Sequence, residues 1–245
     1  MTQDLVLKIF EYVILLFALS LHEASHAWMA SRLGDQTARM LGRVTLNPVK
    51  HIDPIGTVII PLVMLFLPGY GRFLIGWARP TPVNTRNFKR FVHDDVMTTI
   101  AGPASNLLMA AACFAFLLLI GTTSTDGKLA VIVATLTATH PGIALQDVAT
   151  FAGSPGGLLP KLLPVGMFFY FGVLINLFLA VFNLLPLPPL DGSHIFRHIL
   201  PYNMLRFYDS MGMFGLILIL FVGGRVVGYV VSPVLALIDG FLLRL

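Results

Sequence analysis

Long apolar runs constrain this chain more than any other feature of its sequence. Four segments contain roughly 20 or more mostly apolar residues, about the number that a helix needs to cross the hydrocarbon core of a bilayer. Hydrophobic residues make up 56% of the 245 residues and charged residues only 11%, against about 25% charged in soluble globular proteins. The sequence therefore predicts an all-α polytopic membrane protein rather than a soluble, fibrous or disordered chain.

Four segments are predicted to cross the membrane fully, and two others are ambiguous. The predicted crossings are Leu5–Ser31, Val96–Ile120, Pro164–Leu185 and Met211–Val231. Pro54–Leu67 contains Pro61 and is too short for a simple crossing, which favours a re-entrant or partial segment. Leu129–Phe151 starts as an apolar run and is then broken by His140 and Pro141. We therefore expect four to six spans.

The distribution of the basic residues favours four crossings. If neither ambiguous segment crosses, eleven of the 16 basic residues lie on one side of the membrane, four lie on the other, and Arg225 lies inside the last span. The larger set is Arg32, Arg39, Arg43, Lys50, Arg72, Arg79, Arg86, Lys89, Arg90, Arg197 and Arg206. Because basic residues accumulate on the cytosolic side, we expect this set to face the cytosol, in the cell (cytoplasmic) membrane.

Charge and cysteine content limit the other functions that this chain can have. The net charge of +4 does not indicate nucleic-acid binding, because the basic residues are scattered through short loops without a basic helix or arm. The single cysteine, Cys113, lies in an apolar stretch and is expected to be a small buried side chain. No stretch between spans is large enough for a soluble domain, so residues 1–245 are expected to form one membrane-embedded domain.

An HExxH motif, His22-Glu23-Ala24-Ser25-His26, lies near the end of the first predicted span. Side chains at positions i and i+4 of a helix share a face, so both imidazoles can bind one metal ion. Glu23 would lie beside the metal, where a carboxylate can take a proton from a bound water. Ionisable side chains inside a membrane helix cost about 2.5–3.5 kcal/mol each on insertion scales, which favours a functional explanation over a polar cluster at a helix end.

A catalytic zinc ion needs a third protein ligand and an open position for water. Asp191 has the most suitable setting, because Pro186, Pro188 and Pro189 exclude regular helix before it and predict extended backbone. Gly192 permits a tight turn and a close backbone approach. The alternative for Asp191 is a helix N-cap. The other candidate ligands are His51, Asp53, His93, Asp94, Asp95, His140, His194 and His198.

Further motifs follow HExxH in order along the chain. They are Gly42-Arg43-Val44-Thr45-Leu46-Asn47-Pro48, His51-Ile52-Asp53-Pro54-Ile55-Gly56-Thr57, Gly76-Trp77-Ala78-Arg79-Pro80, Ala101-Gly102-Pro103-Ala104-Ser105-Asn106 and Asn183…Pro186…Leu190-Asp191-Gly192. From about Leu21 to His194 the chain resembles the site-2 protease family, in its compact branch without PDZ or CBS domains. The resemblance implies a zinc metalloprotease that cleaves transmembrane segments of other membrane proteins.

The resemblance also implies roles for individual residues. His22, His26 and Asp191 would bind one Zn²⁺ per chain, and Glu23 would be the general base. Asn183 would seat the substrate or stabilise the tetrahedral intermediate.

Several residues in these motifs have more than one interpretation. Asn106 and Asn47 are candidates for substrate binding, although Asn106 is also expected to hydrogen-bond between helices, with Gly102 allowing close packing. His51 and Asp53 are expected to fix the turn into the short segment rather than to bind metal. His93, Asp94 and Asp95 are expected to cap the second crossing helix, and His194 and His198 to have accessory or loop roles.

The segments Pro54–Leu67 and Gly76–Asn84 are candidates to bind an unwound substrate strand by edge pairing. The expected partners are therefore transmembrane protein substrates and the lipid bilayer, with no nucleic acid, while the oligomeric state stays open. Two alternatives remain at this point: a membrane metal transporter or metal sensor, and an inactive relative that only binds partners. The intact HExxH motif argues against both.

Overall fold

The computed structural model describes residues 3–66, 76–140, 143–210 and 223–245, and every regular element in these ranges is a helix. The prediction of an all-α fold is therefore confirmed for the described residues. In chain order the elements are α1 (Gln3–Leu33), α2 (Thr37–Met40), η1 (Pro48–Lys50), η2 (Pro54–Ile59), α3 (Ile60–Phe66), η3 (Thr85–Asn87), α4 (Phe91–Thr123), α5 (Thr125–Thr139), α6 (Leu145–Phe151), η4 (Pro155–Gly157), α7 (Leu163–Asn183), α8 (Asp191–Arg197), α9 (Tyr202–Ser210) and α11 (Gly224–Leu242).

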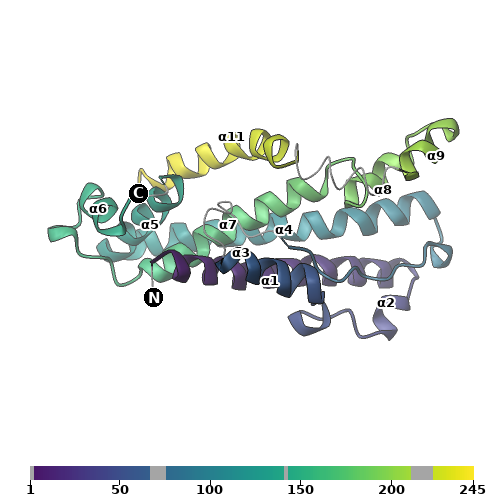
Figure 1. Ribbon diagram of the computed structural model, residues 1–245, viewed down its shortest axis with the longest axis horizontal. Helices are drawn as coiled ribbons and strands as arrows, with labels where there is room; N and C mark the ends of the chain where they lie inside the picture. The colour runs from purple at the N-terminus through teal and green to yellow at the C-terminus, as the bar shows by residue number, and fades with distance from the viewer. Residues whose placement is uncertain (1–2, 67–75, 141–142, 211–222) are drawn as a thin grey trace.

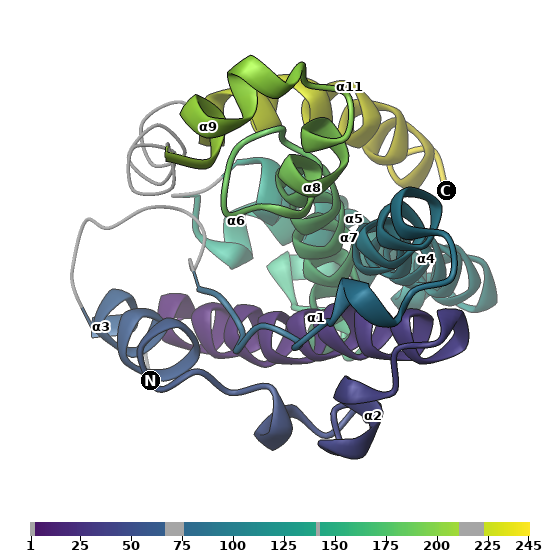
Figure 2. The same ribbon diagram turned by 90° about the vertical axis from the view of Figure 1, so that its right-hand side faces the viewer.

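Helices α4 and α7 form the centre of the molecule, with α1 and α11 on opposite sides of the pair (Figure 1 and Figure 2). Helix α5 packs against both central helices, and Leu117, Val133 and Val173 are fully buried in the core. In the most apolar stretch of α7, 61% of the residues are buried, against 28% in α4 and 17% in α11. Helix α7 is therefore enclosed by protein, whereas α11 leaves apolar side chains exposed, as suits contact with lipid.

Among the described residues, α4, α7 and α11 are long and apolar enough to cross a membrane. Helix α4 contains the predicted crossing Val96–Ile120, and α7 matches Pro164–Leu185 to within two residues at each end. The fourth predicted crossing, Met211–Val231, begins in residues 211–222, which lie outside the described residues. Helix α11 overlaps its second half and continues through the apolar tail to Leu242.

The first predicted crossing, Leu5–Ser31, is a single continuous helix, α1, of 31 residues. Its length would suffice to cross a bilayer, yet it is less apolar than α4, α7 and α11. Its polar side chains include Glu11, His22, Glu23 and His26. The number of crossings therefore stays a prediction.

The segment Pro54–Leu67 is predicted to be re-entrant, and the chain after it, at Trp77, lies beside its first residues. Its described part forms η2 and α3, and Leu67 lies outside the described residues. The Trp77 N–H donates to the Gly56 carbonyl at 3.2 Å, and the Thr57 hydroxyl donates to the Trp77 carbonyl at 2.7 Å. The start of this segment thus lies beside the chain that follows it, which is the geometry that a re-entrant segment requires.

The other ambiguous segment, Leu129–Phe151, is not one continuous helix. Helix α5 ends at Thr139 and α6 begins at Leu145, so the chain breaks where His140 and Pro141 were expected to break it. Residues 141–142 lie outside the described residues. Cys113 is buried in the core between α4 and α7, as predicted.

The C-terminus of α1, the N-terminus of α4 and the C-terminus of α7 lie at the same end of the molecule (Figure 1). Asp35, just after α1, accepts hydrogen bonds from the Asn84 N–H at 2.7 Å and the Asn87 amide at 2.8 Å. At the opposite end, Asp126 accepts from the Lys161 N–H at 3.0 Å. The loops that carry most of the basic residues therefore share one end, as the predicted sidedness requires.

Cysteine labelling tests this topology. On a Cys113→Ala background, cysteines at the exposed positions Met40 and Arg86 should react with a membrane-impermeant maleimide only from the cytosolic side. Cysteines at Lys128 and Lys161, also exposed, should react only from outside. Opposite accessibility of positions 40 and 86 would contradict the re-entrant prediction, since the short segment would then cross.

Candidate metal centre

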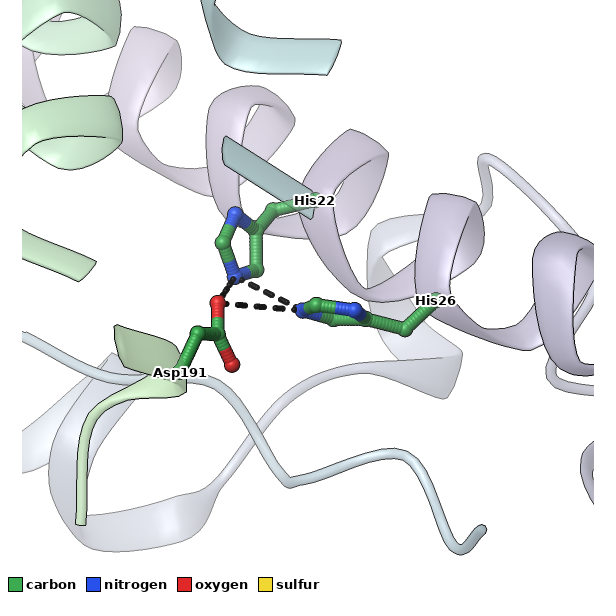
Figure 3. A group of neighbouring side chains, drawn as sticks. All are labelled: His22, His26 and Asp191. Atoms are coloured by element: carbon green, nitrogen blue, oxygen red, sulfur yellow. Dashed lines mark hydrogen bonds and ion pairs between the residues drawn. The ribbon is translucent and has the colours of Figure 1, made fainter. Parts of the chain in front are cut away.

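His22 and His26 lie one turn apart on the same face of α1, and Asp191, the first residue of α8, meets them there (Figure 3). Their Nε2 atoms are 3.1 Å apart. The Asp191 Oδ2 atom lies 3.0 Å from His22 Nε2 and 3.3 Å from His26 Nε2. The two histidines are only 4% and 8% exposed. The two histidines of α1 and Asp191 of α8, which form the predicted ligand set, are thus brought together in the interior.

Buried hydrogen bonds decide which nitrogen of each imidazole carries the proton. His26 Nδ1 lies 2.7 Å from the Thr98 carbonyl of α4. A carbonyl oxygen can only accept, so His26 Nδ1 must donate. The Nε2 atom of a neutral His26 is therefore left with a free lone pair.

The proton of His22 is fixed by two asparagines. Asn176 on α7 donates its amide to the Gly172 carbonyl at 2.9 Å, so its Oδ1 is free to accept from Asn106 Nδ2, also at 2.9 Å. The Oδ1 of Asn106 then lies 2.7 Å from His22 Nδ1, which must donate. Because this chain of bonds starts at a backbone carbonyl, its polarity has one solution, and His22 Nε2 also presents a lone pair.

Three acceptor atoms therefore face one another: two imidazole nitrogens and Asp191 Oδ2. All three lie within 4.8 Å of one another. Asp191 Oδ2 is buried, and the described residues supply no hydrogen bond to it. Lone pairs held this close repel unless a cation lies between them, and a set of two imidazoles and one carboxylate suits zinc. The residues fit a bound divalent metal ion.

Helix α4 approaches the imidazoles so closely that only glycine fits at position 102. A Cβ atom there would lie 2.4 Å from His26 Nε2 and 2.7 Å from His22 Cε1. The predicted close packing at Gly102 is confirmed. The fully buried Asn106, one turn further along α4, contacts His22 rather than an open surface, and this position favours its interhelical role over substrate binding.

The segment between Asn183 and Asp191 is non-helical, as predicted, but it is not extended. The Leu187 N–H donates to the Leu185 carbonyl at 2.8 Å, and the Leu190 N–H donates to the Leu187 carbonyl at 2.9 Å. These two turns fold the segment back toward the end of α7. The prediction of extended backbone is therefore wrong, because proline excludes helix without excluding turns.

The turns between Asn183 and Asp191 require a glycine at position 192, and a hydrogen bond from Tyr208 stabilises them. A Cβ atom on Gly192 would lie 2.3 Å from the Leu184 carbonyl oxygen, so the predicted close backbone approach is confirmed. The Tyr208 hydroxyl of α9 donates to the Pro186 carbonyl at 3.0 Å. The N-cap of α8 is Leu190, without a side-chain cap. The Asp191 carboxylate points toward the histidines instead of capping the helix (Figure 3).

Glu23 lies between the two histidines in sequence and is partly exposed. Its Oε2 atom accepts a hydrogen bond from the Thr81 N–H at 2.7 Å. Thr81 belongs to the non-helical stretch Gly76–Asn84, which thus passes beside the HExxH motif. A partly exposed carboxylate next to two buried imidazoles and the partly buried Asp191 is placed to accept a proton from a water molecule.

Two of the other predicted site residues have local hydrogen bonds. The Asn183 side-chain amide donates to the Leu179 carbonyl of its own helix at 3.0 Å. Asn47 is exposed and caps η1, with its Oδ1 accepting from the Val49 N–H at 3.1 Å. Their roles toward substrate stay predictions.

Of the remaining candidate ligands, His194 is exposed, and the others described here lie in structural hydrogen bonds. His51 Nε2 lies 2.8 Å from the Thr45 carbonyl, and Asp53 caps η2 by accepting from two backbone N–H groups; both fix the turn into η2, as expected. Asp94 accepts from the Arg90 N–H at 2.9 Å at the start of α4. His198 Nε2 lies 2.7 Å from Asp95 Oδ2, which joins the end of α8 to α4.

Sequence reasoning missed Asn176, Thr98 and Thr81. Asn176 carried a signal, because a polar amide in the middle of an apolar span is costly unless it has a partner. Thr98 contacts His26 through its backbone carbonyl, and Thr81 contacts the Glu23 carboxylate through its backbone N–H; the type of residue carries no signal for either backbone contact.

Comparisons with known proteins agree with this geometry. Residues 10–222 match the model of Peptidase family M50. The chain is 34% identical over 224 residues, 91% of its length and 84% of the relative's, to the Bacillus subtilis (strain 168) protein named "Putative zinc metalloprotease YwhC". It is 34% identical over 95 residues, 39% of this chain and 34% of the relative, to the similarly named Rip2 of Mycolicibacterium smegmatis.

No solved structure matches the chain. The family match and the named relatives do not support a membrane metal transporter or metal sensor. This chain belongs to peptidase family M50, the site-2 protease family of intramembrane zinc metalloproteases.

Proposed function

We propose that this integral membrane protein hydrolyses peptide bonds in or near transmembrane segments of other proteins, with one zinc ion held by His22, His26 and Asp191. The observation that carries the proposal is the meeting of two imidazole Nε2 atoms and a buried carboxylate oxygen, at 3.0 to 3.3 Å. Three protein ligands leave a coordination position for water, which a structural zinc site would fill with a fourth ligand.

Zinc, when bound, supplies a Lewis acid that activates a water molecule for attack on the peptide carbonyl. Glu23 takes the proton from that water and later donates it to the leaving amine, so it acts first as base and then as acid. Thr98 and Asn106 hold the two Nδ1–H groups, which keeps both Nε2 lone pairs available to the metal. Asn183 stabilises the oxyanion through its amide, after giving up its hydrogen bond to Leu179.

A substrate helix satisfies its backbone groups internally, so the scissile bond must be unwound before attack. Pro54–Leu67 and Gly76–Asn84 are proposed to bind the unwound strand by edge pairing. The non-helical course of Gly76–Asn84 beside Glu23 supports this assignment.

Residues 1–245 are proposed to act as a single membrane-embedded domain in the cytoplasmic membrane. The active site is proposed to open toward the cytosolic side. The loops richest in Lys and Arg lie at the same end of the molecule as the metal centre (Figure 1), and such loops remain on the cytosolic side.

Removal of the third ligand should release the metal. Purified protein should hold about one zinc per chain, and Asp191→Ala should lose it during dialysis against a chelator, because two imidazoles alone bind zinc weakly. Elemental analysis measures the occupancy. The matched control is Asp209→Ala, which removes a surface carboxylate paired with Arg197 and should keep its zinc. Full, chelator-resistant occupancy in Asp191→Ala would remove this residue from the ligand set.

Glu23→Gln should separate the base from the ligands. The amide cannot accept the proton, while both imidazoles remain, so the variant should keep its zinc and lose proteolysis. The assay is cleavage of a synthetic single-span peptide of about 20 apolar residues with a central Gly-Pro break, which eases unwinding. His22→Ala should lose zinc and cleavage together. Cleavage by Glu23→Gln at the wild-type rate would refute the proposed mechanism.

Asn183→Ala distinguishes an oxyanion donor from a helix-end residue. If the amide serves the transition state, kcat should fall roughly 10²- to 10³-fold with zinc and melting temperature unchanged. If its bond to Leu179 is its only role, the variant should lose about 1 kcal/mol of stability and little rate. Melting temperature, zinc content and cleavage of the same peptide, measured on one preparation, decide between these roles.

A further inference from the structure

The general base is tied to a backbone atom far away in the sequence. Thr81 donates its N–H to Glu23 Oε2 at 2.7 Å across 58 positions, and its hydroxyl donates to the Glu23 carbonyl at 3.0 Å. A glutamate side chain on a helix has several staggered rotamers. A hydrogen bond to the ionised carboxylate is of the strong, charge-assisted kind and selects one of them.

The residues around Thr81 leave it as the sole backbone donor of its tripeptide. Pro80 and Pro82 have no N–H group, so the sequence Pro80-Thr81-Pro82 can donate from the backbone only at Thr81. A residue that precedes proline is restricted to extended conformations. The tripeptide is therefore stiff, and its single N–H points at Glu23.

The same peptide group is held on its other side by Arg43. Arg43 is buried, at 6% exposure. It donates to the carbonyls of Pro80 and Arg79, both at 2.8 Å, and to that of Lys50. The Pro80 carbonyl and the Thr81 N–H belong to one planar peptide unit. A cation bound to the carbonyl polarises this unit and strengthens the hydrogen bond that its N–H makes.

Further contacts fix the stretch on either side of this peptide. The Arg79 N–H donates to the His51 carbonyl at 2.8 Å, and the Asn84 N–H donates to Asp35 at 2.7 Å. Burial alone would raise the pKa of Asp35, but hydrogen bonds from Thr37, Asn84 and Asn87 hold that pKa below its ordinary value. Asp35 thus stays ionised and anchors the stretch to the end of α1.

We propose that Arg43 and Thr81 are positioning residues for the general base. The peptide group between Pro80 and Thr81 is clamped between the Arg43 guanidinium and the Glu23 carboxylate, and it holds that carboxylate in the rotamer that accepts the proton from water. The inference rests on the proposed role of Glu23. Neither Arg43 nor Thr81 hydrogen-bonds to His22, His26 or Asp191 in the described part of the chain, so the clamp acts on the base and not on the metal ligands.

Thr81→Pro tests the backbone donor, because proline removes the N–H and suits an extended segment. We expect kcat on the Gly-Pro peptide to fall roughly 10- to 100-fold, the range for losing a hydrogen bond to a charged group, with KM and zinc content unchanged. Thr81→Ala removes only the hydroxyl and should lose much less. Asp209→Ala, which removes a surface carboxylate paired with Arg197, is the control and should behave as wild type.

Arg43→Met and Arg43→Lys test the other side of the clamp, and they keep the proposal testable if Thr81→Pro does not fold. Arg43→Met should lower kcat in the same way, and Arg43→Lys should recover part of it by donating to one carbonyl. Because both residues act through one hydrogen bond, the double variant Arg43→Met/Thr81→Pro should be little worse than either single variant. Fully additive losses would overturn the shared clamp.

A spectroscopic readout is independent of turnover. The chain contains only two glutamates, Glu11 and Glu23. Protein labelled with [δ-¹³C]glutamate should therefore give two carboxylate NMR signals. The signal that is missing from the spectrum of Glu23→Gln belongs to Glu23. Thr81→Pro and Arg43→Met should shift the Glu23 signal, while Thr81→Ala and the control Asp209→Ala leave it in place. A Glu23 signal at its wild-type position in Thr81→Pro and Arg43→Met overturns the clamp. Wild-type cleavage by Glu23→Gln would instead refute the proposed function.

Discussion

The organisation of this protein depends on holding three lone-pair atoms together inside an apolar helical bundle. The Nε2 atoms of His22 and His26 and the Oδ2 atom of Asp191 repel one another without a cation, and burial makes an unpaired polar atom costlier still. One face of α4 provides the support for both imidazoles: Thr98 supplies a carbonyl, position 102 supplies space, and Asn106 supplies an amide oxygen. Positions 98, 102 and 106 follow one another at intervals of four residues, so they share one face of the helix. A single orientation of α4 about its axis therefore turns all three toward the imidazoles.

Helices and non-helical segments both contribute groups to the candidate metal centre. Helix α1 holds the two imidazoles. Asp191 directly follows the proline-containing, non-helical segment around Pro186, and Thr81, which donates to Glu23, lies in the one around Pro80. Irregular backbone is tolerated at membrane depth only where protein buries it or where it lines a wet cavity. Both segments lie at the metal centre, where their backbone groups are used: Pro186 accepts from Tyr208, and the peptide after Pro80 joins Arg43 to Glu23.

Much of the fold and of the metal centre could be predicted, because the controlling constraints are local. Span length predicted α4 and α7 to within a few residues, and the i, i+4 spacing predicted that His22 and His26 share a face. The choice of Asp191 rested on the prolines before it, and it meets the histidines as expected. The predicted extended backbone failed because the turns depend on hydrogen bonds two and three residues apart, and proline content does not specify these.

The sequence by itself determined an all-helical membrane fold, the pair of imidazoles, the position of Glu23 between them and the Asp191 carboxylate that meets them. These follow from hydrophobic length, from helix periodicity and from the positions of proline and glycine. Only the tertiary structure decided that Asn176 sets the proton of His22 and that Arg43 reaches Glu23 through a peptide group. Those contacts depend on how closely helices approach and how they are rotated about their axes, and these are set by packing between residues far apart in the chain.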